Sequence, residues 1–542
     1  MIKKETCNIS TRLARWAEEK PGTPALLEIS SGRQKTFQEL EHESTLLASG
    51  LIRSGMESGT RALIMVPYGI DFVMLTFALF KAGLVPVLID PGLGRKNVLN
   101  CIQQAQPEGM IGIPLAHAVR KFFPTPFKSI KHKVTVGWFP GCKTLGHILD
   151  SGKADFKAKN MEENDPAAIL FTSGSTGPAK GVLYTHSIFN HQVNILQEQF
   201  DIQSDETDLP TFPLFGLFSC GLGMTSVIPD MDSTRPAKVD PENIIGPINR
   251  FKVSSSFGSP ALWDTVSQYC LENKIKLPTL KRIIMAGAPV SGKLLHRFEN
   301  IVNADCKIQT PYGATEALPV SLIDRREILD QTWPLSNKGE GTCVGKAIPG
   351  AEIKIIAVSD SPILKWKEAS PLSTNTVGEI VIKAPWATRT YFNREDLTQL
   401  AKIEDGNSFW HRMGDLGRLD EKNRLWFYGR KNQRVITGTE TLYTIPCESI
   451  FNQHPGVKRS ALVGTGNRTK QQPAIIIEPV SPEIIKSPSE RKKMTEELLE
   501  LGAASPVTQP VKKVLFHPEF PVDVRHNAKI FREKLSIWAE KQ

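Results

Sequence analysis

The sequence of 542 residues has few cysteines, and they do not follow the spacing of a metal site or of a disulfide framework. Its eight cysteines are scattered along the chain, with no CxxC pair. This pattern excludes the usual zinc spacings and favours reduced thiols in a cytoplasmic protein. We therefore expect ordinary hydrophobic cores, for which a chain of this length has ample material.

The sequence also lacks an apolar run long enough to cross a membrane. The most hydrophobic stretch, FVMLTFALFKAGLVPVLID from residue 72, is broken by Lys81 and then by glycine and proline. Its pattern predicts a buried helix followed by a strand. The first residues, MIKKETCNISTRLARWAEEK, carry charge but no apolar segment, so we expect no secretory signal.

Charge of one sign is not collected in long blocks. Lys and Arg number 66 and are interspersed among 57 Asp and Glu, which leaves a net charge of +9. We infer a mild affinity for anionic substrates or membrane surfaces, so that peripheral membrane contact is compatible with the composition, and we expect no nucleic-acid partner.

Several common catalytic signatures are absent. The chain contains no HExxH, no GxSxG and no pair of glycine fingerprints for dinucleotides. Each Gly-Lys pair is followed by Ala or Leu, whereas a Walker-type NTPase needs Ser or Thr there. A phosphate-binding site in this chain must therefore be of another kind.

One glycine- and hydroxyl-rich segment, LFTSGSTGPAKGV at residues 170–182, stands out from the rest. Glycine is costly to order, and Ser and Thr side chains compete with regular structure, so the segment is predicted to be a loop. Converging N–H groups and hydroxyls followed by Lys180 form a good receptor for phosphate oxygens. The alternative is a flexible linker. The flanks argue against it, because AAILFT predicts a strand and GVLYTHSIFNHQVNILQEQF predicts a helix.

The hydrophobic pattern changes along the chain. From residue 35 onward, helix-like segments such as TFQELEHESTLLASGLIRSG alternate with strand-like segments such as TRALIMVP, which predicts parallel sheets covered by helices. Between about 340 and 428, short runs such as GAEIKIIAV and VGEIVIKAP predict an antiparallel sheet or small barrel. A tail with its own alternation follows GRKN at 429–432. We expect an α/β fold with an N-terminal domain over residues 1–431 and a compact α+β domain over 432–542.

The loop belongs to an ordered series of motifs. After TSGSTGPAKG come MAGAPVS at 285–291, YGATE at 312–316, WHRMGDLGRL at 410–419, YGRKN at 428–432 and PVDVRHNAKIFREKL at 521–535. Together they resemble the adenylate-forming (AMP-binding) superfamily, which includes acyl-CoA synthetases, nonribosomal peptide adenylation domains and firefly luciferases. The resemblance spans nearly the whole chain and implies ATP and Mg²⁺ as cofactors, with a mobile C-terminal lid.

The resemblance also implies a role for each motif residue. Joining a carboxylate to the α-phosphate of ATP brings two anions together, so the site must neutralise charge. Glu316 would bind Mg²⁺ and Thr315 the α-phosphate, while Lys529 on the lid would bridge the carboxylate and the α-phosphate. The implied nucleotide-binding residues are Thr172, Ser173, Gly174, Ser175, Thr176, Gly177 and Lys180 around the phosphates, Gly287, Ala288, Pro289, Tyr312 and Gly313 around adenine, and Asp415 and Arg430 at the ribose.

Departures from the superfamily pattern carry information about the second half-reaction. Pro213 stands where fatty acyl-CoA synthetases commonly have His, and Asn432 occupies the hinge position. The segment TETLYTIPCE replaces one that helps bind the pantetheine arm in CoA-using members, which puts thioester formation in doubt. Phe215 and Phe218 in FPLFGLFSCGLGM are expected to line a lipid pocket, with a core helix as the alternative.

The same details resemble the β-lactone synthetases of bacterial long-chain olefin biosynthesis. This resemblance implies that a 2-alkyl-3-hydroxyalkanoic acid is activated as its acyl-adenylate, after which its own 3-hydroxyl closes a β-lactone and releases AMP. A tethered nucleophile has a high effective concentration, which suits a site without a thiol acceptor. It further implies work beside an alcohol dehydrogenase and a β-lactone decarboxylase. The alternatives are a medium- or long-chain fatty acyl-CoA ligase and an acyl-AMP ligase, and no residue is assigned as the base for the hydroxyl.

Replacement of the lid lysine tests the resemblance directly. We expect Lys529→Ala to abolish adenylation, measured as pyrophosphate release, with little change in thermal stability, because the ammonium is needed only where the two anions meet. Lys534→Ala, five residues further on, is the matched control. Unchanged adenylation in Lys529→Ala would overturn the role given to this lysine.

Overall fold

The first part of the chain folds around a mainly parallel sheet in the strand order β7-β6-β5-β3-β4-β8-β9. The computed structural model describes residues 6–172, 179–523 and 530–542. The strands are β3 (Arg61–Met65), β4 (Val85–Ile89), β5 (Gly109–Gly112), β6 (His132–Thr135), β7 (Lys143–Thr144), β8 (Pro166–Thr172) and β9 (Lys180–Thr185). The helices between them are α3 (Ile70–Ala82), α4 (Arg95–Ala105), α5 (Pro114–Phe122) and α6 (Leu145–Asp150), and α2 (Phe37–Arg53) comes before β3. The predicted alternation of helix and strand is confirmed here.

The most hydrophobic stretch of the sequence forms the centre of this region. In α3, the residues from Phe72 to Ala82 are all buried, and β4 follows directly after the left-handed Gly83. A helix that is apolar on all sides packs inside a domain. No helix within residues 6–172, 179–523 and 530–542 combines the length and apolarity that a membrane span needs.

The glycine-rich loop joins two antiparallel strands, which corrects the predicted strand, loop and helix series. Thr172 at the end of β8 pairs in register with Lys180 at the start of β9. Helix α7 (His186–Phe200) begins only after β9, and the Thr185 hydroxyl caps it by accepting a hydrogen bond from the Ile188 N–H. The prediction was wrong at this point because Val182 and Tyr184, both buried on β9, also fit a helical spacing. Residues 173–178 lie outside the described part of the chain.

A second, larger sheet occupies the middle of the chain. Its order is β17-β18-β20-β21-β16-β15-β14-β13-β12-β10-β11-β1-β2, with β19 paired to β20. The pairs that join β1, β11, β10, β12, β13 and β14 in this order are parallel, and those from β14 to β17 are antiparallel. The predicted antiparallel region therefore exists, and it continues the parallel sheet.

The strands of this sheet have the following bounds: β1 (Pro24–Glu28), β2 (Gln34–Thr36), β10 (Thr207–Pro210), β11 (Thr225–Ile228), β12 (Ser255–Gly258), β13 (Arg282–Met285), β14 (Lys307–Ala314), β15 (Ala317–Asp324), β16 (Thr342–Ala347), β17 (Glu352–Ile356), β18 (Gly378–Lys383), β19 (Lys402–Asp405), β20 (Ser408–Leu419) and β21 (Arg424–Arg430). Helices of this region include α8 (Pro213–Gly221), α9 (Glu242–Arg250), α10 (Pro260–Glu272), α11 (Gly292–Arg297) and α14 (Glu395–Ala401).

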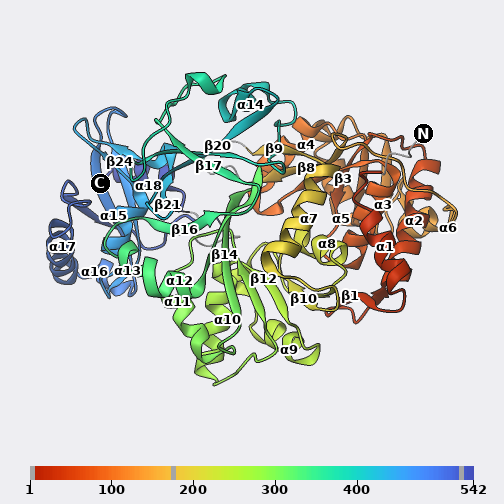
Figure 1. Cartoon of the computed structure of the whole chain (residues 1–542), viewed down its shortest axis with the longest axis horizontal. Helices are drawn as coiled ribbons and strands as arrows, with labels where there is room; N and C mark the ends of the chain where they lie inside the picture. Colours follow the sequence, from red (N-terminus) through yellow and green to blue (C-terminus); the bar gives the residue numbers. More distant parts are fainter. Residues whose placement is uncertain (1–5, 173–178, 524–529) are drawn as a thin grey trace.

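The last part of the chain forms a small sheet in the order β24-β25-β26, at the opposite end of the long axis from the N-terminal sheet (Figure 1). Its elements are β24 (Val457–Thr465), β25 (Gln472–Pro479), β26 (Lys513–Phe516), α15 (Thr444–Phe451), α17 (Pro488–Ala503) and α18 (Arg532–Ala539). Two clusters of buried apolar side chains in this part are drawn entirely from residues 435–539. The mixed α/β architecture with a small C-terminal α+β unit agrees with the predicted fold class.

Candidate active site

A cavity of about 740 Å³ brings together most of the described residues that the motifs singled out. It lies between the carboxyl ends of β13 and β14, strands β20 and β21, and the start of α8. The predicted residues that line it are Lys180, Gly287, Ala288, Pro289, Tyr312, Gly313, Thr315, Glu316, Asp415 and Arg430. Thr172 is placed through its backbone pairing with Lys180. Lys529 and the loop residues Ser173, Gly174, Ser175, Thr176 and Gly177 lie outside the described residues.

Asp415 forms a polar part of the cavity wall together with Arg430 and Tyr312. It pairs with Arg430 in the register of β20 and β21, and the Arg430 Nη1 lies 2.8 Å from the Asp415 Oδ1. The Tyr312 hydroxyl donates a hydrogen bond of 2.6 Å to the Asp415 Oδ2. Asp415 is only 3 % exposed, so burial raises the pKa of its carboxyl group, while Arg430 and Tyr312 oppose the rise. Burial and the carboxylate together hold the pKa of Tyr312 well above its usual range, so Tyr312 remains a hydrogen-bond donor.

Glu316 forms a second polar group with Tyr391, which the motifs did not include. The Tyr391 hydroxyl donates a hydrogen bond to the Glu316 Oε1, and the Lys180 Nζ lies 5.0 Å from the centre of the Tyr391 ring. Burial lowers the pKa of Lys180, whereas the Glu316 carboxylate raises it. The other Glu316 oxygen accepts no hydrogen bond from the residues that the structure describes. The cavity wall here therefore offers a cation and a free carboxylate oxygen.

Lys402 and His411 are functional candidates that sequence reasoning missed. They face each other in the register of β19 and β20, and both are buried. The Lys402 ammonium donates to the Thr388 carbonyl and lies 5.1 Å from the centre of the Phe409 ring. Burial lowers the pKa of Lys402 to about 7. In the sequence, Lys402 follows the helical stretch EDLTQLA and resembles a surface lysine, so its burial is evident only from the strand that pairs with it.

His411 can offer an unprotonated nitrogen to the cavity. Its Nδ1 lies 3.2 Å from the Ala401 carbonyl, which can only accept, so the proton sits on Nδ1. Burial and the nearby Lys402 charge hold the pKa of His411 well below its usual range. The Nε2 makes no hydrogen bond within the described residues and can accept one from a ligand hydroxyl.

One wall of the cavity is apolar and aromatic. Phe212, Phe215 and Phe257 line it, and the rings of Phe215 and Phe257 stack with centroids 3.4 Å apart. The expectation that Phe215 lines a pocket is therefore met. Phe218 is different, because it points toward Phe189 and borders a separate small cavity of about 20 Å³. The two phenylalanines are three residues apart on one face of α8, with ring centroids 5.6 Å apart, and of the two only Phe215 lines the larger cavity.

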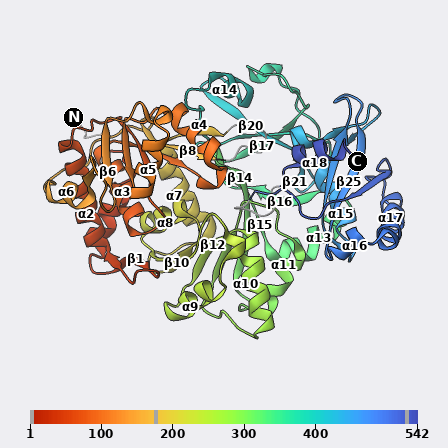
Figure 2. The same cartoon turned by 180° about the vertical axis from the view of Figure 1, so that it is seen from behind.

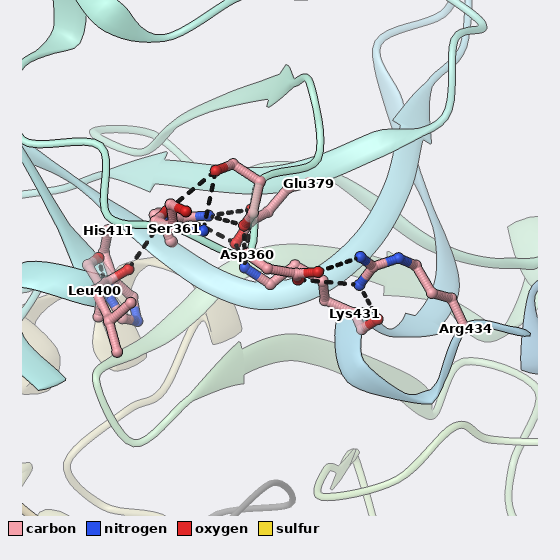
Figure 3. A network of polar contacts seen from close by, with 10 residues as sticks. Asp360, Ser361, Glu379, Leu400, His411, Lys431 and Arg434 are labelled. Carbon is pink, nitrogen blue, oxygen red and sulfur yellow. Dashed lines mark hydrogen bonds and ion pairs between the residues drawn. The ribbon is translucent and has the colours of Figure 1, made fainter. Parts of the chain in front are cut away.

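A buried carboxylate supports the strands that carry these groups (Figure 3). Glu379 on β18 is 1 % exposed, and its oxygens accept hydrogen bonds from Arg412 at 3.1 and 2.7 Å and from Lys431 at 3.0 and 3.2 Å. Further along, Arg434 pairs with Asp360 at 2.6 Å and holds the pKa of that carboxyl group below its usual value. The network ties β18, β20 and the segment after β21 into one unit.

The family comparison agrees with this site. Residues 13–392 match the model of the AMP-binding enzyme family, and the chain belongs to this family. More closely, it is 43 % identical to an olefin beta-lactone synthetase from Xanthomonas campestris over 99 % of this chain and 98 % of that protein. A second olefin beta-lactone synthetase, from Stenotrophomonas maltophilia, is 42 % identical over 98 % of both chains.

Solved structures of distant relatives have the same fold. ATP-bound MatB from Rhodopseudomonas palustris aligns with a TM-score of 0.80 at 18 % identity over 99 % of both chains. The amide bond synthetase McbA from Marinactinospora thermotolerans aligns with a TM-score of 0.78 at 19 % identity over 98 % of this chain and 99 % of the other. The resemblance and the fold class predicted from the motifs are confirmed.

The group of Asp415, Arg430 and Tyr312, called the Asp415 group below, gives a testable expectation for nucleotide affinity. We expect Asp415→Asn to weaken AMP binding about 10- to 100-fold, measured by titration calorimetry, because the carboxylate is lost and Arg430 is left without its countercharge. Asp405→Asn is the control, since Asp405 pairs with Lys383 instead of with Arg430. Equal AMP affinity in Asp415→Asn and the unmodified protein would contradict the assignment.

The depressed pKa of Lys402 predicts a pH-dependent stability. Below pH 7 the Lys402 side chain is a buried ammonium in the folded protein, which lowers the free energy of unfolding. This destabilisation decreases as the pH rises from about 7 toward 10.5, the pKa of the lysine in the unfolded chain. We therefore expect Lys402→Met to raise the melting temperature by several degrees at pH 6. The gain in the free energy of unfolding over the unmodified protein should fall by about 1.4 kcal/mol per pH unit above pH 7. The exposed Lys422→Met should show no such trend. A difference independent of pH would show that Lys402 is not the titrating group.

Proposed function

We propose that this protein uses ATP to convert a 2-alkyl-3-hydroxyalkanoic acid into its acyl-adenylate and then into a β-lactone, with release of pyrophosphate and AMP. The observation that carries the proposal is the identity of 42 to 43 % with two olefin beta-lactone synthetases over nearly the whole length of each chain. The cavity is consistent with it, because polar, charged side chains and aromatic, apolar side chains both line it. An acid with hydrocarbon chains needs both surfaces.

The Asp415 group is suited to the ribose of the nucleotide. A carboxylate has about four acceptor positions, of which Tyr312 and Arg430 use two, so the hydroxyls of a ribose can donate to the rest. The Tyr312 ring and the loop at residues 287–289 border the same space and would hold adenine. We assign the phosphates to Lys180 and to the loop at residues 173–178 on the strength of the motif.

Glu316 fits a magnesium site. Mg²⁺ is commonly held by one or two carboxylates together with substrate phosphates and water, and Glu316 lines the cavity with one carboxylate oxygen that accepts no hydrogen bond from a described residue. Among the described residues there is no cluster of three or more metal-ligating side chains, so the remaining ligands would be phosphate oxygens and water. The bound ion would neutralise phosphate charge as it develops. Tyr391 orients the carboxylate by donating to its other oxygen.

The unit at residues 432–542 is proposed as the lid that brings Lys529 to the cavity. Arg434 bonds to Asp360 across the start of this unit, and Arg532 pairs with Glu448 inside it. The unit also contacts the rest of the chain through Tyr443, whose ring lies 5.5 Å from that of Tyr428, and through Gln453, which donates to the Asn337 carbonyl. Release of these contacts, with the core of the unit intact, would let it turn as a body.

Closure of the lactone needs no second substrate. The 3-hydroxyl oxygen forms a bond to the acyl carbon, the bond from that carbon to the phosphate oxygen breaks, and AMP leaves. The hydroxyl proton must be accepted, and the unprotonated His411 Nε2 is an acceptor in the cavity wall.

The chemistry of substrate and product further suggests two neighbouring enzymes: a ketone-reducing dehydrogenase that supplies the hydroxy acid and a decarboxylase that consumes the lactone. All eight cysteines are free thiols, which suits a cytoplasmic setting.

The product identifies the second half-reaction. We expect ATP, Mg²⁺ and a 2-alkyl-3-hydroxy acid, without CoA, to give AMP and a β-lactone in equal amounts, measured by chromatography and mass spectrometry. The matched substrate is the same acid without its 3-hydroxyl, which should release pyrophosphate once and accumulate as acyl-adenylate. If AMP release needs CoA and the product is a thioester, the enzyme is an acyl-CoA ligase and the proposal fails.

A further inference from the structure

Large apolar side chains are exposed together on the N-terminal part of the chain. Leu115 is 69 % exposed, Phe122 79 % and Trp138 73 %, and Phe123 is exposed beside them. Of the ten large hydrophobic residues exposed in the described part of the chain, four lie within residues 115–138. Singly exposed apolar residues are ordinary, whereas a group of this size marks an interaction surface.

Helix α5 presents this surface along its length. Leu115 and Phe122 are seven residues apart, which places them on one face of the helix and about 10 Å from each other along its axis. Opposite them, Ala116 and His117 are buried, so the apolar residues outside are not needed for the core. Lys121, which precedes Phe122 in the chain, is also exposed.

The loop after β6 holds Trp138 beside the helix. The ring of Phe139 lies 5.5 Å from that of His117 on α5, and the His117 Nε2 is 2.9 Å from the Val134 carbonyl on β6. Figure 2 shows α5 and β6 in the N-terminal part of the molecule, away from the C-terminal strands. We call this surface the α5 face and define it by Leu115, Phe122, Phe123 and Trp138.

The charge around the α5 face is positive, which corrects the expectation that acids and bases are evenly mixed. Residues 109–149 contain six Lys and Arg and no Asp or Glu. Over residues 95–160 the net charge is +8, from eleven bases and three acids, so this segment holds nearly all of the chain's net charge of +9. The exposed bases include Lys121, Lys128, Lys131 and Lys143.

We propose that the α5 face docks the protein onto an anionic lipid bilayer. Exposed aromatic rings next to lysines are the composition of an interfacial helix, whose rings enter the headgroup region while the ammonium groups meet lipid phosphates. A second copy of the chain would bring an equal positive charge, so the charge disfavours a symmetric dimer at this face. The benefit of docking rests on the proposed function: the proposed substrate is a long-chain acid, and such an acid is concentrated in the bilayer.

Vesicle flotation of the full chain without substrate tests the docking. We expect binding to vesicles of mixed phosphatidylcholine and phosphatidylglycerol, little binding to phosphatidylcholine alone, and release in high salt. The double variant Lys121→Glu with Lys128→Glu should lose at least tenfold in partitioning, about fivefold for each lysine lost. Phe122→Ser with Trp138→Ser should lose a similar amount.

Matched variants elsewhere separate docking from general effects. Leu364→Ser removes an apolar side chain that is 50 % exposed in another part of the surface, and Lys422→Glu reverses an exposed charge there. Both should float like the unmodified protein, and all variants should keep AMP affinity. The proposal is overturned if the unmodified protein does not float with the vesicles, or if the α5-face variants float as well as the unmodified protein. It is also overturned if the unmodified protein is a dimer and only the α5-face variants are monomers, because the α5 face would then join two copies.

Discussion

The buried carboxylate of Glu379 is the constraint on which the geometry of the cavity depends. A carboxylate that is 1 % exposed must be paired, and Arg412 and Lys431 both donate to it. Arg412 lies three residues before Asp415 on β20, and Lys431 directly follows Arg430. The network that neutralises Glu379 therefore also places Asp415 and Arg430 in the cavity wall, and it does so at the point where the chain leaves the large sheet.

An excess of positive charge also surrounds Glu316. Lys180 and Lys402 stand near Glu316, and burial lowers the pKa of each. Positive charge that is poorly solvated in the empty protein costs stability, and an anionic ligand would relieve it. The excess positive charge therefore lowers stability without a ligand and favours the binding of anions. This agrees with chemistry that joins a carboxylate to a phosphate.

Sequence reasoning succeeded where a local pattern has a single physical solution. The long apolar run at α3 has to be buried, and the period-two runs of β17 and β18 have to pair. It failed where one pattern fits two structures. Val182 and Tyr184 satisfy both helical and strand periodicity, and pairing with β8 decided for a strand. Phe215 and Phe218 are equally apolar, and only the neighbours of α8 separate the pocket wall from the core.

By itself, the sequence determined the family, the order of the motifs and many of the residues that line the cavity, because these depend on residue types that phosphate and ribose chemistry requires. The tertiary structure alone decided which charges are buried. Lys402 and His411 meet through the pairing of β19 with β20, and Tyr391 reaches Glu316 from 75 residues away. Burial, and with it the pKa of each group, depends on neighbours that are distant in the chain, so no local pattern could predict it.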